Sequence, residues 1–205
     1  DQVKHYQATS GSSSQVKWIP YNTPFIKQLD STYNTWIHDL YLRYPKIKNG
    51  QHYWSMSWIP NDMRDEIKTN DANLFQPFKQ FLLNTIFPVP NEVSQADTIE
   101  ESMYLTAKYL IEADDLSLIS IWSPTFFISI LELILLKKDD LIFSLKNTNQ
   151  KEVLKRVNGL NDMYKLWPEL GLISAWDTAS SKTYAIQLQE LFPHVPFQGK
   201  GLWAT

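Results

Sequence analysis

The sequence predicts an α/β fold in which helices flank a mainly parallel sheet. Two β-prone runs, LSLISIW at 116–122 and LGLISAW at 170–176, contain no charged residue, as expected for strands that are buried on both faces. Each run is followed by a segment with helical spacing of apolar residues, at 123–138 and 177–192. Strands that alternate with helices favour a parallel sheet whose ligands bind at the carboxyl ends of the strands.

The composition supports one folded domain and excludes several classes of function. Of the 205 residues, 43% are hydrophobic and 14% aromatic, which is enough for a buried core. The net charge of -3 is spread along a chain without a basic run, so we expect no nucleic-acid partner. The chain has no cysteine, which excludes disulfides and thiolate chemistry and fits a cytoplasmic protein.

The first elements are predicted to form a strand pair and a long helix. VKHYQATS and VKWIPY are β-prone runs on either side of a loop rich in hydroxyl groups, which predicts a hairpin over 3–21. Thr23 is expected to cap the next helix and Pro24 to be its first residue. We expect this helix to end near Pro45.

Further elements follow in a helical region at 22–113 and in strand-helix units at 114–205. We expect a strand at 52–58, helices at 73–87 and 94–113, and a last strand from 195 into a glycine-rich loop. Ser123 and Pro124 are expected to open the apolar helix, and Asp177 is expected to cap the helix after the second buried run. KKDD at 137–140 is predicted to be a solvated helix end.

No segment is predicted to enter or cross a membrane. The apolar helix at 123–138 is interrupted by Glu132 and is shorter than the roughly 20 residues that a bilayer crossing needs. The first ten residues lack the pattern of a signal peptide. The pattern at both ends of the chain leads us to expect that they are cut from a longer protein.

The hydroxyl-rich loop TSGSSSQVK at 9–17 is suited to phosphate binding. Backbone amides in a tight Gly and Ser loop can converge on phosphate oxygens, hydroxyl groups add donors, and Lys17 supplies a positive charge. The loop does not match the Walker pattern or the dinucleotide fingerprint. From its chemistry alone, a solvated turn remains an alternative.

The order of several motifs resembles that of the adenylate-forming enzymes. TSGSSSQVK resembles their phosphate loop, and WSPTFF, LISAWDTAS and LFPHVPFQGKGLWAT follow in the family's order. Within that superfamily, ISIWSPTF, LWPELGLISAW and LFPHVPFQGKGLWAT are most similar to the Gretchen Hagen family of auxin-responsive acyl acid amido synthetases. The resemblance runs from residue 3 to residue 205, so the whole chain is expected to be part of one large N-terminal domain of such an enzyme.

The resemblance implies an enzyme that uses ATP to convert a carboxylic acid to an acyl adenylate and then joins the acyl group to an amino acid. Lys17 matches the catalytic lysine of the phosphate loop, whereas Ser14 stands where the family usually has glycine. The nucleotide-binding residues implied are Thr9, Ser10, Gly11, Ser12, Ser13, Ser14, Trp176, Asp177, Thr178, Ala179 and Thr205. The glutamate that holds magnesium in such enzymes is expected just beyond Thr205, so no metal ligand is assigned within the chain.

The partners expected are a small carboxylic acid, an amino acid and the remainder of the same enzyme, without which the 205 residues are expected to be inactive. Two alternatives stay open: a non-catalytic remnant that keeps a nucleotide-binding scaffold, and a ligase that forms an acyl thioester. Structural roles are expected for two further groups. These are the histidines His5, His38, His52 and His194, and the aromatic stripe Tyr33, Trp36, Tyr41 and Tyr44, although part of the stripe could line an acyl site.

Overall fold

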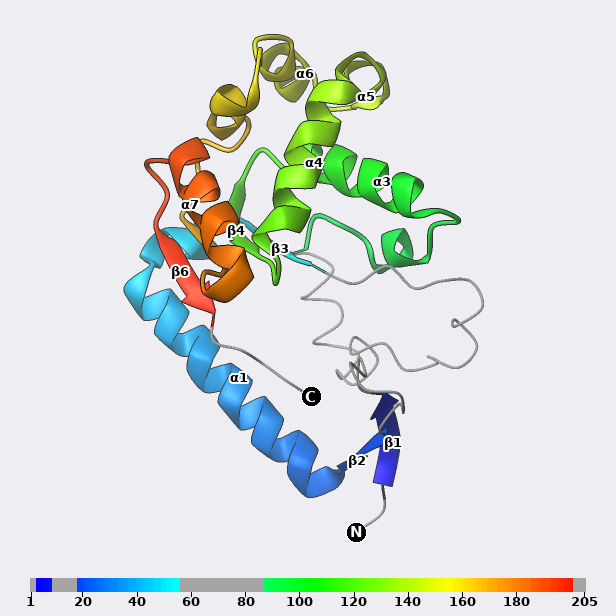
Figure 1. The fold of residues 1–205 in the computed structure, drawn as a ribbon, viewed down its shortest axis with the longest axis vertical. Coiled ribbons are helices and arrows are strands. Elements are labelled where there is room, and N and C mark those ends of the chain that lie inside the picture. Colours follow the sequence, from blue (N-terminus) through cyan, green and yellow to red (C-terminus); the bar gives the residue numbers. More distant parts are fainter. Residues whose placement is uncertain (1–2, 9–17, 56–86, 201–205) are drawn as a thin grey trace. The chain divides into compact units, whose positions relative to one another are not determined.

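The protein is described by a computed structural model that covers residues 3–8, 18–55 and 87–200. The chain divides into two compact units, one formed by residues 1–45 with 202–205 and the other by residues 46–201. Figure 1 shows the elements of both units, which are described separately. The phosphate loop at 9–17, the predicted helix at 73–87 apart from Phe87, and Thr205 lie outside the described residues.

The first unit contains a strand pair and one long helix. Strands β1 (Val3–Ala8) and β2 (Trp18–Asn22) pair antiparallel, as predicted for the hairpin. Helix α1 (Thr23–Arg43) ends before Pro45, also as predicted. Its cap is Asn22, whose side-chain oxygen accepts a hydrogen bond from the Phe25 amide at 2.9 Å. The expected cap at Thr23 was therefore wrong by one residue, because the preceding asparagine is an equally good capping residue.

The second unit is built on a parallel sheet of four strands, which confirms the predicted fold class. The strands are β3 (Gln51–Trp54), β4 (Leu116–Ser120), β5 (Leu172–Trp176) and β6 (Phe197–Lys200), and they lie in that order in the sheet. Every neighbouring pair is parallel. Right-handed crossovers between strands in consecutive order place their helices on one face of the sheet, and helices α3, α4 and α7 lie together over it in Figure 1.

The helices of this unit surround the main hydrophobic core. They are α3 (Ile99–Glu112), α4 (Pro124–Leu136), α5 (Lys138–Ser144), α6 (Thr148–Lys155) and α7 (Lys182–Leu191), with 3-10 turns η1 (Pro45–Asn49), η4 (Asn91–Gln95), η5 (Leu160–Leu166) and η6 (Ala179–Ser181). Phe127, Trp167 and Phe192 pack with ring centroids 6.1 to 6.3 Å apart. The Trp167 indole nitrogen donates to the Leu110 carbonyl at 2.7 Å, so this buried donor is satisfied.

The beginnings of two helices differ from the predictions. Helix α4 begins at Pro124 after Ser123, as expected. Helix α3 begins at Ile99, after Thr98, whose hydroxyl accepts from the Glu101 amide at 3.0 Å, so its predicted start at residue 94 was too early. Asp177 does not cap α7, which begins five residues later, after Ser181.

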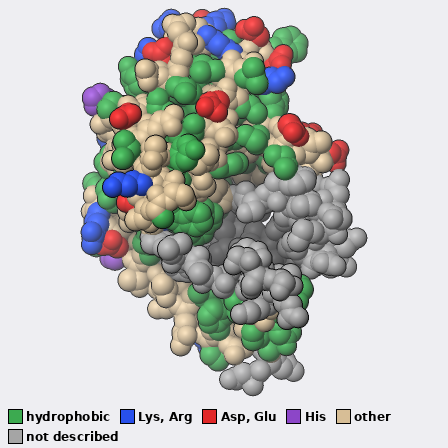
Figure 2. Space-filling view, viewed as in Figure 1, with side chains coloured by type: hydrophobic (Ala, Val, Ile, Leu, Met, Phe, Trp, Pro, Cys, Tyr) green, Lys and Arg blue, Asp and Glu red, His purple; other side chains and the backbone are tan. Residues whose placement is uncertain are grey.

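Two surface and hydropathy features bear on possible partners. Figure 2 shows acidic and basic side chains intermixed at the end of the second unit that carries α5 and α6. Among the helices of the described residues, none has both the length and the hydropathy needed to cross a membrane.

Candidate functional site

The two faces of the parallel sheet differ in chemistry. Side chains alternate between the faces along each strand, and Tyr53, Ile119 and Ile173 belong to the hydrophobic core on one face. The alternate positions carry Trp54, Ser120, Ser174 and Gln198, which the register pairs across neighbouring strands. We call the face that carries these four residues the polar face of the sheet.

Hydrogen bonds connect the polar face across β4, β5 and β6. Ser174 is fully buried, and its hydroxyl donates to the Gln198 side-chain oxygen at 2.9 Å. Ser120 is 2% exposed, and its oxygen accepts from the Lys200 ammonium at 2.8 Å. Buried polar groups on a strand require such partners, so each hydrogen bond fixes the two side chains that it joins.

Lys200 lies at the carboxyl end of β6, two residues after Gln198 on the same face. Its Nζ atom lies 4.8 Å from the centroid of the Trp122 ring and 5.9 Å from that of Trp54. Burial lowers the pKa of Lys200 from 10.5 to about 7, because the charged amine loses its hydration. Contacts with the indole faces favour the charged amine and offset part of this loss.

Trp176 ends β5 next to these groups and is the register partner of Lys200. Its ring centroid lies 5.8 Å from that of Trp122, and its backbone amide donates to the Trp122 carbonyl at 3.0 Å. The Trp176 indole nitrogen is buried and has no hydrogen-bond acceptor among the residues that the structure describes. We call Trp54, Ser120, Trp122, Trp176 and Lys200 the edge cluster.

The loop after β5 contains the remaining predicted nucleotide contacts within the described chain. Asp177 packs against Gly199, where an added Cβ would lie 2.1 Å from the carboxylate oxygen Oδ2. Asp177 therefore contacts the neighbouring strand and, contrary to the prediction, does not cap the following helix. Thr178 and Ala179 are exposed, and Ala179 has a φ of 51°, a left-handed conformation that is uncommon for a residue other than glycine.

Four of the predicted site residues lie in the part of the chain that the structure describes. The structure places Trp176 in the edge cluster and Asp177, Thr178 and Ala179 directly after it. The predicted approach of the phosphate loop and Thr205 to this loop involves residues outside the described part of the chain. The other four members of the edge cluster, Trp54, Ser120, Trp122 and Lys200, were not predicted. One signal could have identified Lys200, which is the only charged residue in the sequence VPFQGKGLWAT at 195–205.

The described histidines His38, His52 and His194 do not belong to the edge cluster. His52 is buried, and its Nε2 atom lies 2.7 Å from the Ile47 carbonyl oxygen, which is the structural role expected for it. Burial lowers the pKa of His52, and this hydrogen bond acts in the opposite direction. His38 and His194 are exposed. Within the described ranges, no three His, Cys, Asp or Glu side chains are grouped so that they could hold a metal ion.

Comparison with known proteins identifies the family. A model of the GH3 family N-terminal domain matches residues 1–158. The solved structure of "AtGH3.15 acyl acid amido synthetase in complex with 2,4-DB" is similar, with a TM-score of 0.74 and 13% identity over 98% of this chain and 41% of that chain. A second structure, "GH3.15 acyl acid amido synthetase", gives a TM-score of 0.69 and 12% identity over 98% of this chain and 40% of that chain.

These matches concern the fold and its extent. At 12 to 13% identity, the similarity to the solved structures shows the fold alone. The chain spans about two fifths of the length of those structures. No curated protein matches the chain.

Proposed function

The chain belongs to the GH3 family through its N-terminal domain, and from this membership we propose that it takes part in amide synthesis through an acyl adenylate. ATP activates a carboxylic acid, pyrophosphate leaves, and the acyl group passes to the amine of an amino acid. The family match over residues 1–158 is the observation that carries this proposal. The names of the solved structures with the same fold support it, since both are acyl acid amido synthetases.

The position of the edge cluster supports the same chemistry. In open parallel sheets, ligands bind beyond the carboxyl ends of the strands, and Trp54, Trp176 and Lys200 occupy the ends of three strands. Attack of a carboxylate on the α-phosphorus brings two negative charges together. Positioned donors and positive charge are therefore expected to provide most of the catalysis.

The cofactors and the nucleotide-binding residues are part of the proposal. We propose ATP with Mg²⁺ as the phosphate donor, the hydroxyl loop at 9–17 as its phosphate site, and Lys17 as the catalytic lysine. Thr205 and the loop from Trp176 to Ala179 complete the nucleotide contacts. The described residues do not offer three grouped metal ligands, so no step is assigned to Mg²⁺.

Pyrophosphate exchange on the full-length protein tests this function. The acids to offer are 2,4-DB, which is bound in one of the similar structures, benzoate, and straight-chain fatty acids of increasing length. We expect acid-dependent exchange, and we expect Lys17→Ala to slow it by roughly a hundredfold or more, because a preorganised charge on the phosphates is lost. Lys4→Ala, in an exposed position of β1, is the matched control and should exchange normally.

The alternatives give different results in the same assay. Absence of exchange with every acid, together with measurable ATP binding, would favour the nucleotide-binding scaffold. Exchange followed by acyl transfer to coenzyme A in preference to amino acids would favour the thioester ligase.

A further inference from the structure

We propose that Lys200, Ser120 and Trp176 form a binding site for a substrate oxyanion at the carboxyl edge of the sheet. The oxyanion is either the carboxylate of the acid or a phosphate of the nucleotide, which share the same hydrogen-bonding chemistry. This inference rests on the proposed function and assigns a role to residues that the phosphate-loop chemistry does not use.

The first argument is the set of donors in the edge cluster. The Ser120 oxygen accepts from Lys200, and its own hydroxyl hydrogen has no acceptor among the described residues. The Trp176 indole nitrogen is a second buried donor that lacks an acceptor within the same part of the chain. A buried donor without an acceptor is costly, and an oxyanion offers several acceptor positions at once.

The second argument is charge. The amine of Lys200 lies close to two indole rings, in surroundings that disfavour its charged form. An anionic ligand would place a negative charge beside Lys200 and so stabilise the charged form of the amine, which burial disfavours. Charge-assisted hydrogen bonds are roughly twice as strong as neutral ones, so the cluster is better suited to an anion than to a neutral amide or hydroxyl.

The third argument is the position of these groups in the fold. Ser120, Trp176 and Lys200 lie at the ends of three adjacent parallel strands, and their backbones are held by the sheet register. The amide of Ile121 also donates to the Ser174 carbonyl at 2.9 Å, which continues the pairing of β4 with β5 beyond Ser120. Groups held on a rigid sheet keep their geometry when a ligand binds, which is what a binding site requires.

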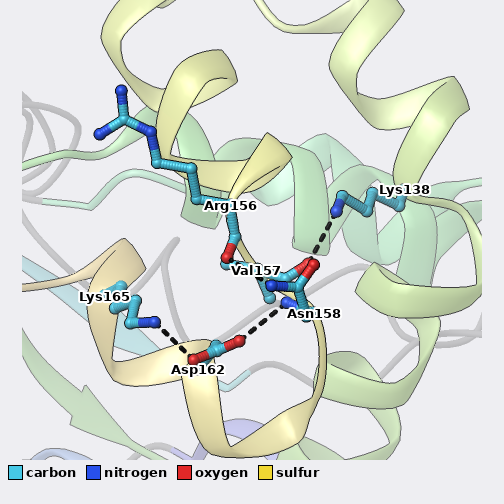
Figure 3. A network of polar contacts seen from close by, with 6 residues as sticks. All are labelled: Lys138, Arg156, Val157, Asn158, Asp162 and Lys165. Carbon is cyan, nitrogen blue, oxygen red and sulfur yellow. Dashed lines mark hydrogen bonds and ion pairs between the residues drawn. The ribbon is translucent and has the colours of Figure 1, made fainter.

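Lys138, in the same unit, makes contacts that are typical of a structural lysine. The Lys138 ammonium donates to the Lys155 carbonyl oxygen at 2.9 Å. It also donates to the Val157 carbonyl oxygen at 2.7 Å (Figure 3). Both acceptors are backbone groups at the end of α6. Because Lys138 binds backbone at a helix end, it is the matched control for Lys200.

Steady-state kinetics of the full-length protein, with the panel acid that gives the fastest exchange, test the proposal. Lys200→Met should raise the KM for the acid or the KM for ATP by roughly ten- to a hundredfold, the loss expected for a charge-assisted contact. A rise for the acid alone identifies the carboxylate, and a rise for ATP alone identifies the phosphate. Lys200→Arg should recover part of the affinity, whereas Lys138→Met should leave both KM values unchanged.

Unchanged KM values for both substrates in a folded Lys200→Met protein would overturn the proposal. If that variant does not fold, Ser120→Ala replaces it and should raise the same KM by a smaller factor. If the wild-type protein shows no exchange with any acid, the proposed function fails. Calorimetric titration of benzoate and of ATP against wild type and Lys200→Met then tests the site separately, and equal affinities of the two proteins for both ligands would overturn it.

Discussion

Two half-buried lysines of the second unit have opposite surroundings. Lys138 donates to two backbone carbonyls near the end of α6, and the same region holds Asp162, which accepts from the Asn158 amide at 2.8 Å and pairs with Lys165 (Figure 3). The Lys200 ammonium donates to the Ser120 hydroxyl oxygen and lies close to the Trp54 and Trp122 rings. The network around Lys138 satisfies backbone groups of the fold, whereas the edge cluster contains the Trp176 indole nitrogen, which has no acceptor among the described residues.

The surroundings of the two lysines indicate different roles: Lys138 stabilises the fold, and Lys200 is suited to binding a ligand. A lysine at the end of a helix compensates unpaired carbonyl groups and the negative end of the helix dipole. A lysine that is buried at the carboxyl edge of a parallel sheet and has a lowered pKa is typical of ligand sites. Each prediction below changes one region and uses the other as its reference.

The largest effect is expected on the stability of Lys200 variants at different pH. The fall of its pKa from 10.5 to about 7 corresponds to roughly 5 kcal/mol at most. Between these pH values the unfolded chain binds more protons than the folded chain, so the stability of the wild type rises with pH relative to a variant without the amine. Lys200→Met should therefore be more stable than wild type near pH 6, and this advantage should disappear as the pH approaches 10.

Chemical denaturation of wild type and Lys200→Met at several pH values measures this difference. A stability difference that does not change between pH 6 and pH 10 would show that burial does not disfavour the charged amine. Lys138→Met is the reference, and we expect it to lose about 1 to 3 kcal/mol at every pH, because two carbonyl oxygens lose their donor.

A smaller effect is expected at two glycines, one in each region. Gly199→Ala would place a methyl group 2.1 Å from the Asp177 carboxylate, so the Asp177 side chain must move aside, at a cost of about 1 to 2 kcal/mol. Around Gly159, beside the Lys138 network, no atom lies within 4 Å of an added Cβ. Its backbone is extended, with a φ of -171°, so Gly159→Ala should leave stability unchanged or raise it by less than about 1 kcal/mol.

Thermal unfolding of the two glycine variants distinguishes these expectations. Equal Tm values for Gly199→Ala and wild type would mean that Asp177 moves without strain and does not help to fix the edge cluster. A lower Tm for Gly159→Ala would mean that the Lys138 region is packed more tightly than the contacts indicate.

Much of the fold of the second unit was predictable, because its signals are local. The runs around Leu118 and Ile173 predicted buried strands, since a parallel sheet with two buried faces selects continuous apolar sequence. Ser123 and Pro124 predicted the start of α4 for an equally local reason. The prediction that Asp177 caps α7 was wrong, because the chain after β5 passes through a left-handed residue at Ala179 and a 3-10 turn before α7 begins.

The edge cluster was not predictable from local signals. Lys200 and Ser120 are 80 residues apart in the sequence, and only the strand order and register bring them together. KKDD was expected to be solvated, and Lys137, Asp139 and Asp140 are exposed. Lys138 differs from them because it is half-buried and donates to the Lys155 and Val157 carbonyls, which cannot be identified from the charge pattern.

Proton uptake on ligand binding tests the central claim most directly. At pH 8 the amine of Lys200 is mostly neutral, since its pKa is about 7, and an oxyanion bound to it favours the charged form. Of the other titratable groups on these strands, burial lowers the pKa of His52 and raises that of Tyr53, both away from pH 8. Asp177 follows β5 at this edge. It is present in both proteins that are compared, so it does not contribute to the difference between them.

The measurement is calorimetric titration of the full-length protein at pH 8 in two buffers of different ionisation enthalpy. The ligands are the fastest-reacting acid and ATP, each added alone. We predict uptake of up to about one proton by wild type with the ligand that Lys200 binds. We predict binding without this uptake in Lys200→Arg, because arginine stays charged. Equal proton uptake in the two proteins, or none in the wild type with either ligand, would contradict the assignment of Lys200 to the oxyanion.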